Sequence, residues 1–442
     1  MKLKSLLFIG ASVLGLNASA QTWVADSVEM GNGYANDVYY SLKNDSITAV
    51  SNSNWHLAFQ TLPPIGANSN VSIRANHVVG SSKVNVYSLH MKATGKYGTA
   101  LTVGDTTGKV ALYNTDTSWN LGAFNRMNDA TNPFDFSWGS YDVSSHSVKG
   151  DSLYLITINN DAYQVWVQEY KSTPTDSISY IVRIANFDGT NDKQIRVYRK
   201  NGYTDRNFAY YDVVNNVILD REPSRTSWDF VFTRANEFVA NPGGGGFSPY
   251  PVTTVYTNFG VTVAEVKDLN PSTTGYATMP YLTDIHVIGS DWKVAPGAPP
   301  ALPYWTVRDS AHYFIKTKLT NEYYQLHFTN FYGTSNGRAV FQKRKLGDVT
   351  SVNNVKAPVT AYSIYPNPAT TEVTIMVDAK EAASTMIYVT DMTGKVVDRY
   401  NVSQQAGLNG YRINTGAYAN GNYLVTITAA DWKVTEKLSV AH

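Results

Sequence analysis

The sequence predicts an all-β protein, and three observations support this class. Alternating apolar and polar residues run through much of the 442-residue chain, which contains 31 tyrosines together with many Thr and Ser residues; such a composition favours strands. No segment longer than about a dozen residues shows convincing helical periodicity. Turn-forming clusters such as Asn159-Asn160-Asp161 separate the alternating runs, as expected for antiparallel hairpins.

A stretch that occurs twice indicates an internal duplication. Asp37–Thr61 and Asn207–Arg234 each have a tyrosine pair near the start, then a polar turn, and then a Trp-x-x-x-Phe segment. Further along, Tyr163–Tyr170 (YQVWVQEY) is matched by Tyr324–Phe331 (YQLHFTNF). We therefore expect two tandem antiparallel β units of related structure.

Alternation within the duplicated stretch predicts which side chains form the core. Successive side chains of a strand point to opposite faces, and burying a large apolar side chain contributes about 1.5–3 kcal/mol. The residues expected on the buried face are Trp55, Leu57, Phe59, Trp228, Phe230 and Phe232. His56 alternates with them and is expected at the surface. His327 lies opposite Leu326 and Phe328 and is given the same interpretation, while His312 has no evident partner.

The remaining elements follow in order along the chain. In the first unit, residues 21–203, strands are expected at 70–77, 84–92, from Tyr97, and at 109–113, 153–158 and 163–170. The second unit, residues 204–347, repeats this order, with a Gly/Pro-rich loop at 241–251. A polar linker at 348–360 leads to strands at 373–377, 386–390, 395–400, 422–428 and 433–440. These last strands predict a small β-sandwich at 361–442.

Composition excludes several classes of function. The net charge is +1, with no block of basic residues, so binding to nucleic acid or to an anionic membrane surface is not expected. Cysteine is absent, which excludes disulfides, thiol catalysis and cysteine-ligated metals.

The first twenty residues have the form of a secretory signal peptide. Lys2 and Lys4 precede an apolar run, Leu6–Leu16, and Ala18-Ser19-Ala20 supplies small residues at a cleavage site. No other segment approaches the roughly 20 apolar residues of a membrane span. The mature, exported protein is expected to begin at Gln21.

Signatures of an enzyme are weak. Gly333–Gly337 reads G-T-S-N-G, but a nucleophile elbow requires a helix after it, and the following residues alternate as a strand. This pentapeptide is therefore interpreted as a hairpin turn. Asp229, Glu265 and Asp284 are carboxylates that could form an acid/base pair, but a sequence cannot show their separation. We expect no catalytic activity.

The last unit carries a series of specific motifs. These are Ile364–Ala369 (IYPNPA), Val389–Lys395 (VTDMTGK), Ala417–Tyr423 (AYANGNY) and Lys437–Val440 (KLSV). Together they resemble the C-terminal sorting domain of type IX secretion cargo in Bacteroidetes. The resemblance implies export in two steps, with the type IX machinery as a partner at the outer membrane. It also implies removal of the domain in many cases, leaving the protein released or on the cell surface.

The duplicated part resembles the HmuY family of haem-binding proteins. The resemblance is carried by Tyr210–Asp212, Trp228–Phe232, Tyr313–Lys316 and Tyr324–Phe328. It implies an all-β protein, secreted or surface-bound, that grips haem between two loops with paired axial ligands. The sequence departs from the family in lacking a lipoprotein cysteine, in having two units and in its sorting domain. The family pattern places no ligand pair here.

Candidate haem ligands come from the residue types that can bind the iron, which include His, Met and Tyr. Met279 and His286 lie in an aromatic, loop-like segment of the second unit and are the candidate pair. The aromatic side chains expected to flank the porphyrin are Tyr276, Tyr281 and Trp292. The alternative is that Met279 fills a gap in the core and His286 lies on an ordinary strand.

Two main classes of function therefore stay open, and a purely structural component of the cell surface is a third. The first is extracellular ligand binding, with haem as the preferred cofactor. The second is a cofactor-free adhesin or carbohydrate-binding surface protein, because exposed tyrosine and tryptophan rings combine an apolar body with a polar tip.

Overall fold

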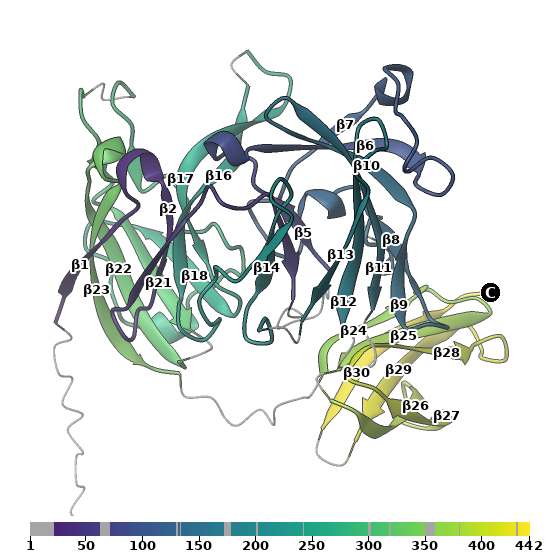
Figure 1. Ribbon diagram of the computed structural model, residues 1–442. Helices are drawn as coiled ribbons and strands as arrows, with labels where there is room; N and C mark the ends of the chain where they lie inside the picture. Colours follow the sequence, from purple (N-terminus) through teal and green to yellow (C-terminus); the bar gives the residue numbers. More distant parts are fainter. Residues whose placement is uncertain are drawn as a thin grey trace, which may run out of the picture.

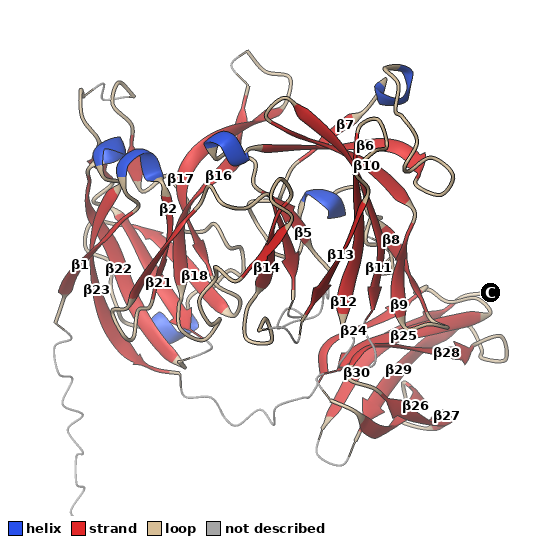
Figure 2. Ribbon diagram, viewed as in Figure 1, coloured by secondary structure: helices blue, strands red, loops and turns tan. Residues whose placement is uncertain are grey.

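The computed structural model shows an all-β protein. It describes residues 22–61, 71–129, 131–132, 134–171, 178–199, 202–241, 243–298, 302–317, 320–349, 359–379, 381–429 and 432–442. Figure 1 shows two β units side by side and a third, smaller unit beneath one of them. Within the described residues, Figure 2 shows strands throughout and helices only as short single turns. None of these described helices is long and apolar enough to cross a membrane.

The first large sheet belongs to the unit that carries the third unit beneath it. Its main path is β13 (Lys193–Tyr198), β12 (Ser179–Asn186), β11 (Asp161–Lys171), β10 (Ser152–Ile158), β6 (Val84–Lys92) and β7 (Val110–Leu112). The strands β8 (Gly139–Asp142) and β9 (Ser147–Gly150) join it beside β11. The predicted hairpin around Asn159 is present, since β10 and β11 pair antiparallel there. The strand expected from Tyr97 is absent, because residues 94–98 form turns.

The second large sheet repeats the order of five of these strands. It runs β1 (Val24–Glu29), β23 (Arg338–Asp348), β22 (Glu322–Phe331), β21 (Ala311–Thr317) and β18 (Val261–Lys267). One register shift also recurs: it lies between Val167 and Glu169 of β11 and between Phe328 and Asn330 of β22. The segments Tyr163–Tyr170 and Tyr324–Phe331 therefore occupy equivalent places. We call β1–β12 the first copy and β13–β23 the second copy.

Two smaller sheets are built from strands of both copies. The first exchange sheet is β15 (Val217–Leu219), β14 (Phe208–Asp212), β4 (Leu57–Gln60) and β5 (Ile73–Ala75). The second exchange sheet is β3 (Ile47–Ser51), β2 (Asn36–Tyr40), β16 (Phe230–Ala240) and β17 (Phe247–Thr257). Tyr211 lies opposite Leu57 in one, and Tyr40 lies opposite Phe230 in the other. Each copy thus lends its tyrosine strand to the partner copy.

This reciprocal exchange changes the predicted division of the chain. The units expected at 21–203 and 204–347 do not coincide with the sheets, because β1 to β3 pair with strands of the second copy. The strands β14 and β15 extend a sheet of the first copy in return. Strand pairing is non-local, and two similar partners cannot be told apart by reading along the sequence.

The prediction for the two tryptophans is wrong in both copies. Leu57 and Phe59 pack in one core, whereas Trp55 packs with Ala58 on the opposite face. In the same way Trp228 packs with Val231, away from the core that holds Phe230 and Phe232. The reason is that β4 and β16 begin two residues after each tryptophan, so the alternation does not extend back to it.

The prediction of a surface position for His56 is also wrong. His56 is buried, and its Nδ1 atom accepts the backbone N–H of Val213 at 3.1 Å. At the equivalent place in the second copy, Asp229 accepts the backbone N–H of Leu42 at 2.7 Å. Each side chain therefore secures the chain just after an exchanged tyrosine strand. Both faces of β4 and β16 are covered, because alternate residues of each strand pack in two different clusters.

The third unit is the predicted β-sandwich. One sheet is β24 (Val359–Tyr365), β25 (Glu372–Ala379) and β28 (Gly407–Asn414). The other is β27 (Val396–Gln404), β26 (Ala383–Asp391), β29 (Gly421–Thr428) and β30 (Lys433–Val440). The predicted signal peptide and most of the predicted linker lie outside the described residues. This unit packs against the first copy, where Met376 and Leu408 join its core and the Tyr141 hydroxyl donates to the Leu408 carbonyl at 3.3 Å.

Short elements complete the connections. They are β19 (Lys293–Val294), β20 (Thr306–Val307) and the 3-10 turns η1 (Asn32–Tyr34), η2 (Gly80–Ser82), η3 (Gly104–Thr106), η4 (Ala123–Asn125), η6 (Tyr276–Thr278) and η7 (Gly333–Ser335). The last of these joins the antiparallel strands β22 and β23, so the G-T-S-N-G pentapeptide is a hairpin connection.

Candidate ligand-binding cavity between the exchange sheets

A cavity of about 80 Å³ lies where the two exchange sheets meet. Equivalent residues of the two copies line it in pairs, as the strand registers show. The pairs are Tyr39 with Tyr210, Val231 with Ala58, and Tyr256 with Arg74. The duplication therefore makes the cavity wall nearly symmetric. The symmetry is broken at one pair of equivalent positions, where one copy has Arg74 and the other has Tyr256.

The aromatic walls are held by matched contacts. Trp55 meets Tyr210 edge to face with ring centres 5.0 Å apart, and Trp228 meets Tyr39 in the same way at 4.9 Å. Trp119 closes a further side, donating its indole N–H to the Thr257 carbonyl at 2.7 Å. Aromatic pairs of this geometry are favourable beyond the area they bury, so the walls are well fixed.

One ion pair crosses between the copies at the cavity. Arg221 donates to Asp37 and to the Ser51 carbonyl, both at 2.7 Å, and Thr233 donates to the other oxygen of Asp37 at 2.7 Å. Both charged residues are buried. Asp37 is fully compensated, and it is the one carboxylate among the described residues that line this cavity.

Arg74 has no such compensation. Its guanidinium donates to the carbonyls of Ser118 at 2.9 Å and Thr115 at 3.0 Å, and lies 5.0 Å from the centre of the Trp119 ring. No described carboxylate lies within ion-pair distance, although the residue is only 6% exposed. Burial lowers the pKa of Arg74 to about 10, so it stays charged at neutral pH. A buried charge without a counter-charge is costly.

The rest of the lining adds positive charge and hydrogen-bond donors. Arg234 also lines the cavity. His77 is neutral, because its Nδ1–H donates to the Val84 carbonyl at 2.8 Å while Nε2 accepts from the Asn114 N–H at 3.2 Å. Burial lowers the pKa of His77 to about 4. Within the described residues, Arg221 Nε and Trp55 Nε1 are buried without a hydrogen-bond partner. The lining suits an acceptor, and above all an anion.

The candidate haem ligands lie elsewhere. Met279 packs against the outer face of the second large sheet with Phe314 and Leu346, whereas His286 has its Nδ1 atom 3.5 Å from Asp284. The chain bridges β18 between these two residues, where Leu282 pairs with Val263, and bridges β17 after His286, where Gly289 pairs with Val255. Neither the Met279 nor the His286 side chain lines the cavity between the exchange sheets. Trp292, expected beside the porphyrin, is buried and stacked on Phe328 at 3.8 Å.

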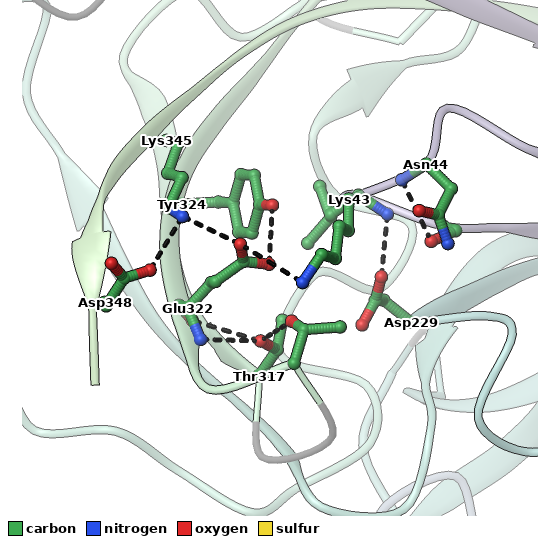
Figure 3. Close-up of polar contacts among 11 residues, drawn as sticks. Lys43, Asn44, Asp229, Thr317, Glu322, Tyr324, Lys345 and Asp348 are labelled. Atoms are coloured by element: carbon green, nitrogen blue, oxygen red, sulfur yellow. Dashed lines mark hydrogen bonds and ion pairs between the residues drawn. The ribbon is translucent and has the colours of Figure 1, made fainter. Parts of the chain in front are cut away.

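The carboxylates considered for catalysis each have a separate partner. Glu265 pairs with Lys267 at 3.4 Å, and Asp284 contacts His286. Asp229 holds the turn after β2, which Figure 3 shows beside Glu322. Glu322 is buried and accepts from Lys345 at 2.8 Å and from the Tyr324 hydroxyl at 3.0 Å. This polar network fixes the exchanged turn.

The arginines of the cavity belong to no sequence motif. Arg74 is the middle residue of the three-residue strand β5, between Ile73 and Ala75. The only feature of the sequence that could have indicated a buried arginine is the position of this charged residue within a short apolar strand. Its burial depends on Trp119 and on strands of the second copy, which local patterns do not place.

The comparison with protein families identifies the third unit. Residues 363–441 match the family described as secretion system C-terminal sorting domain. This unit is a type IX sorting domain. The protein is therefore secreted, either attached to the cell surface or released, and the type IX machinery is its partner in export.

The other comparisons do not extend this assignment to the duplicated part. No curated protein sequence matches the chain. The crystal structure of dimeric latent PorU from Porphyromonas gingivalis is similar over 90% of this chain and 36% of that chain, at 10% identity and a TM-score of 0.18. A likeness at this level carries no argument about fold or function. The resemblance to the HmuY family finds no support here.

Proposed function

We propose that this secreted protein binds a small organic anion outside the cell, in the cavity between the exchange sheets. The observation that supports this most directly is Arg74, a buried cation with two carbonyl partners; no described carboxylate lies within ion-pair distance of it, and Asp116 acts on it only from farther away. A carboxylate entering the cavity would supply that charge. Hydrogen bonds to charged groups contribute about 1.5–3 kcal/mol.

The dimensions and the walls define the ligand further. An engineered cavity of about 150 Å³ takes a benzene molecule, so a space of about 80 Å³ accepts an anionic group while the rest of the ligand lies in the mouth. The lining is partly aromatic and includes Trp55, Trp119 and Phe208. A carboxylate attached to a small flat body fits these properties, and a porphyrin is far too large for the enclosed part.

Calorimetric titration of the full-length protein with benzoate, benzamide and acetate tests this proposal. We expect benzoate to bind, benzamide to bind at least tenfold more weakly, and Arg74→Met to lose the preference for benzoate. Without ligand the variant should unfold at the same or a higher temperature, because an unpaired buried charge is removed. Arg183→Met is the matched control, since Arg183 pairs with Asp192 on the first large sheet. Equal binding of benzoate and benzamide would contradict the proposal.

Haem stays the ligand that the sequence predicts. Hemin added to the same protein would give a shifted Soret band if it is bound through side chains. If that band is lost in both Met279→Ala and His286→Ala, haem rather than an organic anion is the ligand. Retention on polysaccharide, with no response to benzoate or hemin, would favour the adhesin or carbohydrate-binding alternative.

A further inference from the structure

A second cavity, of about 570 Å³, opens on the outer face of the second large sheet. Its volume lies in the range of roughly 300–1,000 Å³ that is usual for small-molecule sites. The polar and aromatic residues that line it are Trp23, Asp309, His312, Gln325, His327 and Arg344. We call it the histidine cleft. It shares no residue with the cavity between the exchange sheets.

The equivalent surface of the first large sheet is closed and apolar. The cross-strand pair His312 and His327 corresponds to Leu153 and Trp166, because Tyr324–Phe331 aligns with Tyr163–Tyr170. In the first copy these two side chains are covered by Tyr97 and Leu101. By the same registers, Arg344 corresponds to Ala185. The second copy thus replaces an apolar contact by three basic or ionisable groups.

A glutamine common to both copies shows how the two surfaces differ. In the first copy Gln164 accepts from the Gly98 N–H at 3.0 Å and donates to the Thr99 carbonyl at 2.7 Å, which ties down the covering loop. Its counterpart Gln325 instead accepts from Arg344 at 2.9 and 2.7 Å and lies 3.3 Å from His312 Nδ1. The glutamine that closes one surface therefore orients the basic groups of the other.

The cleft brings two histidines and an arginine close together. The rings of His312 and His327 stack with centres 4.8 Å apart, and the edge of Trp23 meets His327 at 5.0 Å. The Arg344 guanidinium lies 4.5 Å from the Trp23 ring and has no described carboxylate partner. The other charged groups facing His312 are Asp268, by its electrostatic effect, and Asp309 at the rim.

We propose that the histidine cleft binds a small hydrophilic anion, bearing carboxylate or phosphate groups, and does so more tightly as the pH falls. Arg344 attracts the anion at every pH. The two stacked histidines repel each other when both are charged, and an anion beside them removes that repulsion. Binding is therefore coupled to proton uptake. Haem does not fit this arrangement, because side chains on neighbouring strands approach from one side whereas axial ligands bind opposite faces of the iron.

The proposal is tested by calorimetric titration of the full-length protein with citrate and with inorganic phosphate at pH 5.5, 6.5 and 7.5. Affinity for one or both is expected to rise by up to about tenfold per unit fall in pH for each proton taken up. Repeating the titration in buffers of different ionisation enthalpy measures that uptake. Citrate binding alone would identify a carboxylate ligand, and phosphate binding alone a phosphorylated one.

Substitution by the residues of the first copy supplies the critical variants. Arg344→Ala should weaken binding at least tenfold at each pH, and His327→Trp should remove most of the pH dependence. His327→Gln does the same with a smaller change of volume, which guards against a variant that fails to fold. Arg183→Gln, on the first large sheet, is the control that should bind normally. Affinity that does not change with pH, or binding of neither anion, would overturn the proposal, as would tight binding of Zn²⁺ in their place.

Discussion

In the first large sheet the outer face is closed by Leu153 and Trp166, whereas the equivalent positions of the second carry His312 and His327. Five strands follow the same order in both sheets, and one register shift recurs at the equivalent position. The inner faces stay apolar in each copy. This contrast shows that the apolar inner core and the exchanged strands maintain the common fold. The side chains of the outer face can differ between the copies, and functional groups can therefore be placed there.

The exchange sheets show the same separation on a smaller scale. Backbone hydrogen bonds match between the copies, yet the side chain that receives the turn N–H is His56 in one and Asp229 in the other. Arg74 and Tyr256 likewise occupy equivalent places in the cavity wall. Because the backbone is matched, a difference in behaviour between such positions can be assigned to the side chains alone.

The largest expected effect tests whether the two copies fold as one. Leu57 and Phe230 are equivalent, and both are fully buried opposite an exchanged tyrosine. Leu57→Ala should cost about 2–5 kcal/mol and Phe230→Ala about 3–5 kcal/mol. Because the strands are exchanged, each variant should lower one shared unfolding transition, measured by circular dichroism in urea. If two unfolding transitions are seen, and each substitution lowers only one of them, the copies are independent.

A second prediction concerns the ion pair that only one side of the cavity has. Asp37 corresponds to Phe208 in the other copy. The first exchange sheet therefore has an aromatic side chain at the position where the second has this carboxylate. Arg221→Met leaves Asp37 buried with Thr233 as its remaining side-chain donor and should destabilise the protein by about 3–5 kcal/mol.

The double variant Arg221→Met with Asp37→Asn provides the internal control. It should recover most of the loss, because no unpaired charge remains. Arg206→Met breaks an exposed pair with Asp220 and should cost no more than about 1 kcal/mol. If the double variant is as unstable as Arg221→Met in urea, packing rather than charge explains the loss.

Local patterns predicted the individual strands well. Val84–Lys92 is a strand with the expected bounds, because alternation over nine residues leaves little ambiguity. The sorting domain was predicted from its motifs, since short sequences such as Ile364–Ala369 are specific to it. The strand expected from Tyr97 failed because Gly98 has a positive φ of 81°, which belongs to a turn.

The partners of those strands and the sites between them could not be predicted. Tyr40 and Tyr211 lie in equivalent segments, and by sequence each strand could have paired within its own copy. The pairing with the other copy is visible only in the three-dimensional structure. The stacking of His312 on His327 depends on strand register. Arg74 reads as an ordinary strand arginine until Trp119 and Tyr256 close over it.

The smallest effect compares Asp229 with His56 through the pH dependence of stability. Burial raises the pKa of Asp229 to about 6 in the folded protein, against about 3.9 when unfolded. The folded state then binds more protons between these values, so this contribution to stability falls as the pH rises from about 4 to about 6. Burial lowers the pKa of His56. The unfolded state then binds more protons, and stability falls as the pH drops below about 6.5.

The two equivalent positions should therefore respond to pH in opposite directions. Asp229→Asn keeps an oxygen to accept the Leu42 N–H and should stabilise the protein by up to about 3 kcal/mol well above pH 6, with little gain at pH 4. His56→Asn should reduce the loss of stability on the acidic side and leave the alkaline side unchanged. Urea denaturation at pH 4.5, 6 and 7.5 measures both. The same pH profile for the two variants would mean that the charge at these positions has no part in holding the exchanged turns.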